Sequence, residues 1–564
     1  MIYLYKNEPL TVEGGASFLE IARSVQDEYD YPIILAKVGQ KLVELNKTVP
    51  RDDDPYEEDD ARSADPLPVL EFITIAERDG HKTYERGAVM MLLRAVARVF
   101  GRKLKRVKIE YAIGDGIFFT VENPELLTDE KVEEIKTAMQ RYVRDDEKFE
   151  KTKMQTDAVR ELFRHYGMTD KNRLFHYRRT SVTNIYRLGN YQNYFYGYMP
   201  PSCGMVDVFD LKKLDEGLLL ILPKMSSPTT PGEEAIPRKL FTVMVNNNTW
   251  CENIGVPTVG ALNDAISRGE GRDIILSSEA YQEHQIGEIA GRIKEGSRRI
   301  VLIAGPSSSG KTSFSYRLSI QLANLGLKAH PIAADNFFID RDKMETDENG
   351  EYDFESLRAL NVEQFNDYML ELLKGKKIEM PTYDFRTGKQ VFNGNTLGIG
   401  KSDVLIIEGI HGLNDEFSAR IDPEDKFRIY ISAVTALNID EHNRIPTTDH
   451  REIRRIVRDA RTRGYSATNT ISRWASVRAG EEKHIFPFQE SADVLFNSAS
   501  VYELAVLKIF AEPLLFSVPM DVPEYPEAKR LLKFLEYFVP LSPEDVPRNS
   551  LMREFIGGSV FPVG

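Results

Sequence analysis

The clearest chemical signal in this chain is a glycine- and serine-rich segment that directly follows the apolar run 300–304. The segment fits the pattern G-x-x-x-x-G-K-[ST], in which backbone N–H groups surround phosphates, the lysine adds positive charge and the hydroxyl holds Mg²⁺. It therefore predicts binding of a nucleoside triphosphate. The residues expected at the phosphates are Gly305, Pro306, Ser307, Ser308, Ser309, Gly310, Lys311, Thr312 and Ser313.

The residues after this loop have the periodicity of a helix. Phe314, Leu318 and Leu322 recur every fourth residue, Leu325 continues the stripe, and Gly326 stands where such a helix would end. The unpaired N–H groups and partial positive charge of the helix N-terminus would then face the phosphates. A turn without a ligand is the alternative, and the position of the helix disfavours it.

Two carboxylates follow apolar runs that are expected to be strands. Residues 327–334 lead to Asp335, and residues 403–407 lead to Glu408. Because parallel strands end at one edge of a sheet, both carboxylates should lie near the phosphate loop. Asp335 could deprotonate an acceptor hydroxyl. The alternative is that its carboxylate only caps a helix or stabilises a turn. Glu408 could hold Mg²⁺ together with Thr312.

The segment 451–463 is unusually basic for an acidic protein. On a helix, Ile453, Ile456, Val457 and Ala460 would share one face, and four arginines the other. We expect those guanidinium groups to point outward, unbalanced by acids, and to contact phosphates. An ordinary solvated face is the alternative, and nucleic-acid binding is disfavoured because interleaved aromatics are missing. The four arginines are Arg451, Arg454, Arg455 and Arg458.

Composition limits the class of protein. The chain has 564 residues, a formal net charge of −14 and two cysteines, Cys203 and Cys251. Its length indicates several domains, and its charge argues against nonspecific binding to nucleic acid or anionic membranes. The cysteine count suits a reducing compartment, and no apolar run is long enough to span a bilayer. We expect a cytoplasmic protein without a membrane partner.

The pattern along the chain predicts an α/β protein in which a P-loop domain with a parallel sheet follows two α+β domains. Strands alternate with helices after residue 285, which is typical of a parallel sheet. Loop signals at 226–232 and 246–248 suggest that the preceding segment connects domains. The expected parts are a small α+β domain (1–50), an acidic linker (51–66), a second α+β domain (67–224), a connecting segment (225–284), the catalytic domain (285–500) and a helical extension (501–564).

From about residue 285 to 500 the chain resembles the uridine kinase and phosphoribulokinase family of P-loop kinases. Its motifs occur in the family's order. Beyond the phosphate loop these are Asp335-Asn336-Phe337-Phe338, Tyr352-Asp353-Phe354, Pro381-Thr382-Tyr383-Asp384-Phe385, Ile407-Glu408-Gly409-Ile410, the arginine segment through Arg463-Gly464, and a closing strand at 491–496.

This resemblance implies ATP as the donor, Mg²⁺ and a nucleoside acceptor. It implies that Asp335 is the general base on the 5′-hydroxyl and that Lys311 holds the β- and γ-phosphates, with Thr312 and Glu408 on Mg²⁺. A lid over the phosphates would carry Arg455, Arg458 and Arg463. The ribose would contact Asp353, next to Tyr352, and the base would lie beside Tyr383. The family's habit also suggests a homo-oligomer.

Two departures concern the base. Uridine-cytidine kinases have a His five residues after the tyrosine, where this chain has Gly388, and an Arg after the lid's Arg-Gly, where this chain has Tyr465. Both contact the pyrimidine in that family. Because hydrogen-bond mismatch is what rejects near-substrates, base preference should be relaxed or changed.

The first 50 residues resemble the TGS domain of threonyl-tRNA synthetases, and the following domain resembles the synthetase editing domain. Two zinc-binding histidines of that domain become Arg86 and Met90 here. The domain's zinc-binding Cys-x-x-x-His pattern is also missing, because Asp207 stands four residues after Cys203. This implies a scaffold, regulatory or oligomerisation role without zinc, with residual RNA affinity as a weaker expectation.

The sequence thus predicts an ATP-dependent kinase acting on the 5′-hydroxyl of a ribonucleoside. One alternative keeps the fold and phosphorylates another hydroxylated metabolite, such as a sugar phosphate. Another is a nucleotide-switched RNA-binding or regulatory protein, which the set of Lys311, Thr312, Asp335 and Glu408 disfavours.

Overall fold

The computed structural model describes residues 1–51, 67–101, 106–344, 352, 354–435 and 437–563. It separates into two compact units. Unit 1 comprises residues 1–237, 258–261 and 438–444, and unit 2 comprises 238–257, 262–437 and 445–564. The expected acidic linker lies almost wholly outside the described residues. No helix among those described is both long enough and apolar enough to cross a membrane.

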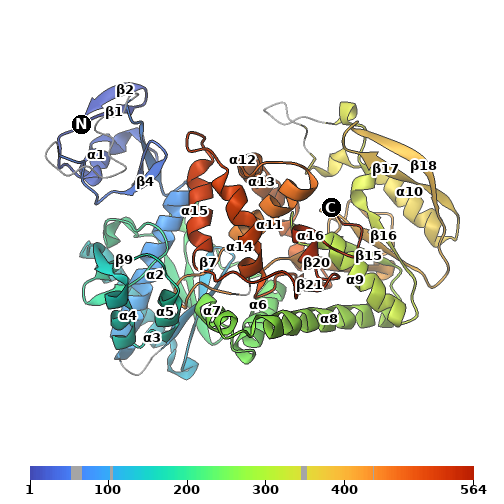
Figure 1. Ribbon diagram of the computed structural model, residues 1–564, viewed down its shortest axis with the longest axis horizontal. Coiled ribbons are helices and arrows are strands. Elements are labelled where there is room, and N and C mark those ends of the chain that lie inside the picture. The colour runs from blue at the N-terminus through green and yellow to red at the C-terminus, as the bar shows by residue number, and fades with distance from the viewer. Residues whose placement is uncertain (52–66, 102–105, 345–351, 353, 436, 564) are drawn as a thin grey trace. The chain divides into compact units, whose positions relative to one another are not determined.

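Unit 1 is built from antiparallel sheets with helices beside them (Figure 1). Ser17 begins α1 with a capping box, because its hydroxyl accepts from the Glu20 N–H while the Glu20 carboxylate accepts from the Ser17 N–H. The strands are β1 (Ile2–Tyr5), β2 (Glu8–Thr11), β3 (Ile33–Val38), β4 (Lys41–Glu44), β5 (Leu70–Thr74), β6 (Val107–Ile113), β7 (Gly116–Val121), β8 (Glu150–Gln155), β9 (Val182–Leu188), β10 (Tyr191–Asn193), β11 (Asp210–Leu214), β12 (Gly217–Ile221), β13 (Pro223–Lys224) and β14 (Ser227–Pro231). Its helices are α1 (Phe18–Val25), α2 (Arg78–Phe100), α3 (Asp129–Arg144), α4 (Thr156–His165) and α5 (Thr169–His176).

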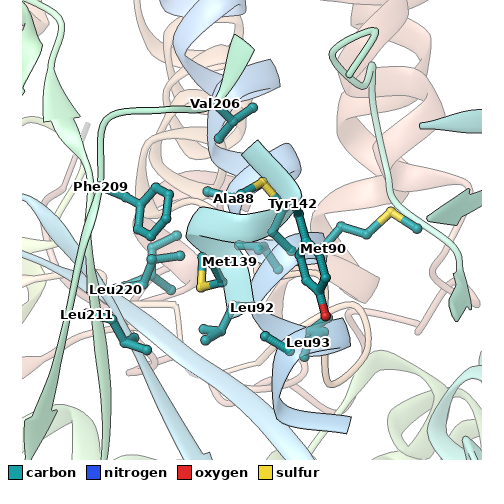
Figure 2. Packing of buried hydrophobic residues seen from close by; sticks show 14 of the residues in the cluster. Ala88, Met90, Leu92, Leu93, Met139, Tyr142, Val206, Phe209, Leu211 and Leu220 are labelled. Atoms are coloured by element: carbon teal, nitrogen blue, oxygen red, sulfur yellow. The ribbon is translucent and has the colours of Figure 1, made fainter. Parts of the chain in front are cut away.

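The main core of unit 1 surrounds α2. Figure 2 shows Met90 and Leu92 of this helix among Met139 and Tyr142 of α3 and Leu220 of β12. Met90 and Cys203 are fully buried in this core, so both act as packing residues. The TGS-like and synthetase-like assignments of this part of the chain stay predictions.

A short segment from the later half of the sequence completes unit 1. Within residues 438–444, Asp440 forms an ion pair of 2.5 Å with Lys171, and both side chains are fully buried. Asp440 also accepts from the His442 N–H and from the Asn443 amide, at 2.8 Å each. These contacts satisfy the buried charges, which would otherwise be costly.

Unit 2 is organised around a five-stranded parallel sheet with strand order β16-β19-β15-β20-β21. This confirms the predicted α/β fold. Its strands are β15 (Ile300–Ala304), β16 (Ala329–Ala333), β19 (Val404–Glu408), β20 (Lys426–Ser432) and β21 (Val494–Asn497), and a separate hairpin pairs β17 (Ile378–Asp384) with β18 (Lys389–Leu397). Its helices are α6 (Arg238–Asn253), α8 (Gly271–Glu295), α9 (Lys311–Asn324), α10 (Val362–Leu373), α11 (Thr447–Thr462), α12 (Ala467–Ser472), α13 (Trp474–His484), α14 (Glu503–Phe516), α15 (Tyr525–Leu535) and α16 (Arg553–Ile556); α7 (Val259–Ser267) has residues in both units.

Both faces of the parallel sheet are covered. Side chains alternate along β15, so Ile300 and Leu302 enter one apolar cluster with α10, whereas Val301 and Ile303 enter another with α8 and α9. A strand buried on both faces reads as a continuous apolar run, as residues 300–304 do.

The loop predicted at 246–248 is wrong, because these residues lie inside α6. The Asn247 side chain is buried and accepts a hydrogen bond of 3.2 Å from the Asn497 amide of β21. A tertiary partner thus satisfies a polar side chain that locally favours a turn. The helix α8, seen in green in Figure 1, begins at Gly271, within the segment expected to connect domains.

Candidate phosphoryl-transfer site

The phosphate loop connects β15 to α9 and depends on two glycines. A Cβ on Gly305 would lie 2.0 Å from the carbonyl oxygen of Ile431, so only glycine fits against β20. Gly310 has φ +84° and is the N-cap of α9. Glycine adopts this left-handed conformation without strain, which turns the chain into the helix at the loop's end.

Lys311 and Thr312 begin α9, and both side chains have partners in the site. The Lys311 ammonium donates to the carbonyl oxygens of Gly305 at 2.9 Å and Pro306 at 3.2 Å. The Thr312 hydroxyl donates to Glu408 Oε1 at 3.0 Å. The structure therefore brings together the hydroxyl and the carboxylate that the sequence predicts as Mg²⁺ ligands.

Asp335 follows β16 and Glu408 ends β19, two neighbouring parallel strands. Burial raises the pKa of Asp335, while the positive charges of Lys311 and Arg463 oppose the shift. Burial also raises the pKa of Glu408 to about 7, and the nearby Asp335 carboxylate adds to it while Lys311 opposes it. Two carboxylates, one of which accepts from the Thr312 hydroxyl, are hard oxygen ligands, so this donor set fits Mg²⁺.

The expectation of an outward, unbalanced arginine face on α11 is wrong, because all four arginines pair with carboxylates. Arg451 and Arg454 are both buried. Arg451 pairs with Glu481 of α13 and donates to the Ser307 carbonyl oxygen at 3.1 Å. Arg454 pairs with Glu503 of α14 and donates to the Ser308 carbonyl oxygen at 3.1 Å. The acids that balance them come from later helices. Through their bonds to the Ser307 and Ser308 carbonyl oxygens, these two arginines stabilise the backbone of the phosphate loop.

The three arginines predicted for the lid converge on one carboxylate, that of the buried Asp459. Arg455 Nε lies 3.2 Å from Asp459 Oδ2, Arg458 Nη2 lies 2.7 Å from Oδ1, and Arg463 Nε lies 3.7 Å from Oδ1. Arg455 Nη1 also donates to the Ser307 hydroxyl at 3.0 Å. Asp459 therefore holds three positive charges beside the phosphate loop.

The residues predicted for the acceptor belong to an aromatic cluster next to Asp335. The Tyr383 ring lies 5.4 Å from that of Phe338 and 5.0 Å from that of Phe385. Tyr352 is exposed, and its ring lies 6.4 Å from that of Phe354. Asp353, the predicted ribose ligand, lies outside the described residues.

Glu355 is a site residue that the sequence reading missed. Burial and the nearby carboxylate of Glu481 raise its pKa to about 7, and the charges of Arg455 and Lys311 oppose the shift. It therefore lies within the electrostatic reach of Lys311, which also acts on Asp335, and of Asp335 itself. The sequence offered one signal for it, since Glu355 directly follows the motif Tyr352-Asp353-Phe354.

A second missed residue is Glu554, on the short helix α16 near the C-terminus. Its Oε2 accepts from the Ser313 N–H at 3.1 Å and from the Ser313 hydroxyl at 2.8 Å. Arg461 of α11 fixes the same segment by donating to the Glu554 carbonyl oxygen at 2.8 Å. No local pattern connects residues 241 positions apart, so the sequence could not reveal this contact.

A P-loop after β15, with carboxylates at the ends of β19 and of β16 beyond it, is the arrangement of P-loop kinases. Residues 300–505 match the family model described as Phosphoribulokinase / Uridine kinase family. Residues 300–505 are therefore similar to the kinases of this family, which supports a phosphotransferase activity for this part of the chain.

Curated relatives match a similar length of the chain. Uridine kinase of Ureaplasma parvum is 26% identical over 196 residues, which is 35% of this chain and 86% of that protein. Uridine kinase of Staphylococcus aureus is 27% identical over 208 residues, covering 37% of this chain and 91% of that protein. A solved structure described as a possible uridine kinase from Bacillus stearothermophilus is 21% identical, covers 36% of this chain and 89% of that chain, and has a TM-score of 0.25.

Proposed function

We propose that this protein is an ATP-dependent nucleoside kinase that transfers the γ-phosphoryl group to the 5′-hydroxyl of a ribonucleoside. The observation that carries this proposal is the convergence of Asp335, Glu408 and Thr312 at the N-terminus of α9. The similarity of residues 300–505 to uridine kinases supports a nucleoside as the acceptor.

In this mechanism the chain positions the reactants and neutralises charge. Lys311 would release the loop carbonyls and hold the transferred phosphoryl group. Asp335 would accept the proton of the acceptor hydroxyl, and its raised pKa brings the carboxylate nearer the range of a working base. Arg455, Arg458 and Arg463 would turn from Asp459 towards the phosphates and stabilise their charge in the transition state.

Thr312 and Glu408 would hold Mg²⁺, which when bound supplies charge neutralisation at the phosphate oxygens. The pKa of Glu408 near 7 means that burial disfavours its charged form, and a cation would reverse that effect. Glu355 would accept hydrogen bonds from acceptor hydroxyls, a role proposed for Asp353 as well. Tyr383 and Tyr352 would flank the base.

The test compares the wild type with Lys311→Ala and Asp335→Asn in an assay of nucleoside monophosphate formation. Both variants should lose turnover, and Asp335→Asn should keep ATP binding largely intact, because its carboxylate faces the acceptor. Normal turnover of Asp335→Asn would reject its role as base. Lys328→Ala, in the exposed turn before β16, is a matched control that should keep full activity.

A panel of acceptors decides between the proposed function and another hydroxylated substrate. Ribonucleosides should be phosphorylated with ATP and Mg²⁺, and sugar phosphates should not. If only sugar phosphates were phosphorylated, the acceptor in the proposed function would be a sugar phosphate instead of a nucleoside. Homo-oligomer formation and residual RNA affinity of unit 1 also stay proposals, which light scattering and a tRNA-binding assay would test.

A further inference from the structure

Arg341 occupies the space beside Gly388, the position at which the sequence departs from the pyrimidine-reading pattern. Gly388 has φ +68°, and a Cβ there would lie 2.7 Å from Arg341 Cβ and 2.9 Å from its Nε. The Arg341 N–H donates to the Gly388 carbonyl oxygen at 2.7 Å. A side chain at position 388 and the guanidinium of Arg341 therefore exclude each other.

The guanidinium lies among aromatic rings that begin three residues after Asp335. The Phe338 ring is 5.6 Å from that of Phe354 and 6.0 Å from that of Phe385. Arg341 Cζ lies 6.0 Å from the Phe354 ring centre. Phe385 is 52% exposed, so a ring face of the cluster is open to a ligand. Flat aromatic faces beside the catalytic carboxylate suit a planar heteroaromatic ring.

The hydrogen-bonding groups of Arg341 are only partly used. One terminal nitrogen, Nη2, donates to the Phe385 carbonyl oxygen. The buried Nε–H has no hydrogen bond of good geometry among the described residues, although the guanidinium acts on the neighbouring Tyr383 hydroxyl and opposes the rise of its pKa. A guanidinium has five N–H donors and no acceptor, and a buried donor left without a partner is costly. A ligand with an acceptor oxygen would add a hydrogen-bond partner to this guanidinium.

We infer that Arg341 reads the nucleobase of the acceptor and selects bases with a ring carbonyl on the edge away from the sugar. Such bases are uracil, with O4, and hypoxanthine and guanine, with O6. Cytosine and adenine present an amino group at the same place, which would set donor against donor. This inference rests on the proposed nucleoside kinase function, because it assigns that enzyme's specificity.

The test is kcat/KM of the full-length protein for uridine, cytidine, inosine, guanosine and adenosine. Carbonyl bases should exceed their amino counterparts by roughly 100-fold or more, because hydrogen-bond mismatch at a buried polar group discriminates strongly. Comparing uridine with inosine and guanosine shows whether the carbonyl belongs to a pyrimidine or a purine. Arg341→Met should reduce the preference to within about tenfold, through a loss of kcat/KM for the carbonyl bases.

Lys343→Met is the matched control, since Lys343 is an exposed cation on the same short 3-10 turn and should leave the preference unchanged. Arg341→Lys keeps the positive charge but lacks the planar guanidinium, so it should also lose most of the preference for carbonyl bases. This variant replaces Arg341→Met in the test if Arg341→Met is unstable. Equal use of uridine and cytidine, and of inosine and adenosine, would overturn this inference alone. If the wild type phosphorylates no nucleoside, the proposed function falls and the inference with it.

Discussion

The carboxylate of Glu554 binds both the backbone N–H and the hydroxyl of Ser313, in the first turn of the P-loop helix α9. This N–H belongs to the group of unpaired donors that a helix N-terminus offers to anions. A nucleotide phosphate and the Glu554 carboxylate would therefore compete for it.

Replacing this carboxylate should strengthen nucleotide binding. In Glu554→Gln the charge is lost and the remaining hydrogen bond is weaker, so we expect the Kd of ATP to fall about fivefold. Isothermal titration calorimetry measures it. Glu544→Gln, at an exposed acid nearby in the sequence, should leave the Kd unchanged. Weaker ATP binding in Glu554→Gln would instead make this carboxylate part of the nucleotide site.

Neighbouring arginines on α11 should respond differently to substitution. Arg454→Met leaves the buried Glu503 without its cation, which should lower the free energy of unfolding of unit 2 by about 3 to 5 kcal/mol. Arg455→Met should lower kcat with little change in stability, because Arg455 lies next to the phosphate loop and shares Asp459 with two other arginines. Denaturant unfolding and steady-state kinetics separate the two effects. Equal stabilities of the two variants would contradict the structural role of Arg454.

Glu355 should control a pH dependence near neutrality. Its pKa is raised to about 7, so the carboxylate is protonated below that pH and ionised above it. If the ionised form accepts the acceptor hydroxyls, kcat/KM should rise with pH through about 7, and Glu355→Gln should lose this limb and much of its activity. A limb that persists in the variant would assign the titration to Glu408 or Asp335.

Stability provides an independent readout of the same group. A carboxyl whose pKa is higher in the folded than in the unfolded state stabilises the fold below its unfolded pKa, and this contribution is lost as pH rises through the folded value. The wild type should therefore lose stability relative to Glu355→Gln between pH 5 and pH 8. Melting temperatures across this range measure the difference, and parallel curves would contradict the raised pKa.

In unit 1, Lys171→Met should destabilise the fold by about 3 to 5 kcal/mol, because Asp440 would be left as an unpaired buried charge. The loss should be smaller at pH 5 than at pH 8, since loss of the cation raises the pKa of Asp440 and lets it protonate. Lys171→Met with Asp440→Asn should recover part of the stability. Denaturant unfolding checks both, and Lys153→Met, an exposed lysine on β8, is the control.

Much of unit 2 could be predicted because its signals are local. A continuous apolar run indicates a strand that is buried on both faces. The spacing of Phe314, Leu318 and Leu322 indicates the helix α9, and these three side chains are fully buried. Since parallel strands end at one edge of a sheet, the sequence alone was enough to place Asp335 and Glu408 near the phosphate loop. The roles of these residues stay predictions until the variants are measured.

Only the tertiary structure decided which partner each charged residue has. The sequence by itself determined the phosphate loop, the parallel sheet and the edge at which carboxylates gather, because these follow from periodicity and chain direction. The pairing of Arg454 with Glu503, of Ser313 with Glu554, and of Arg341 with Gly388 joins distant segments. Such contacts depend on how helices and turns pack after folding, and no local pattern of residues encodes them.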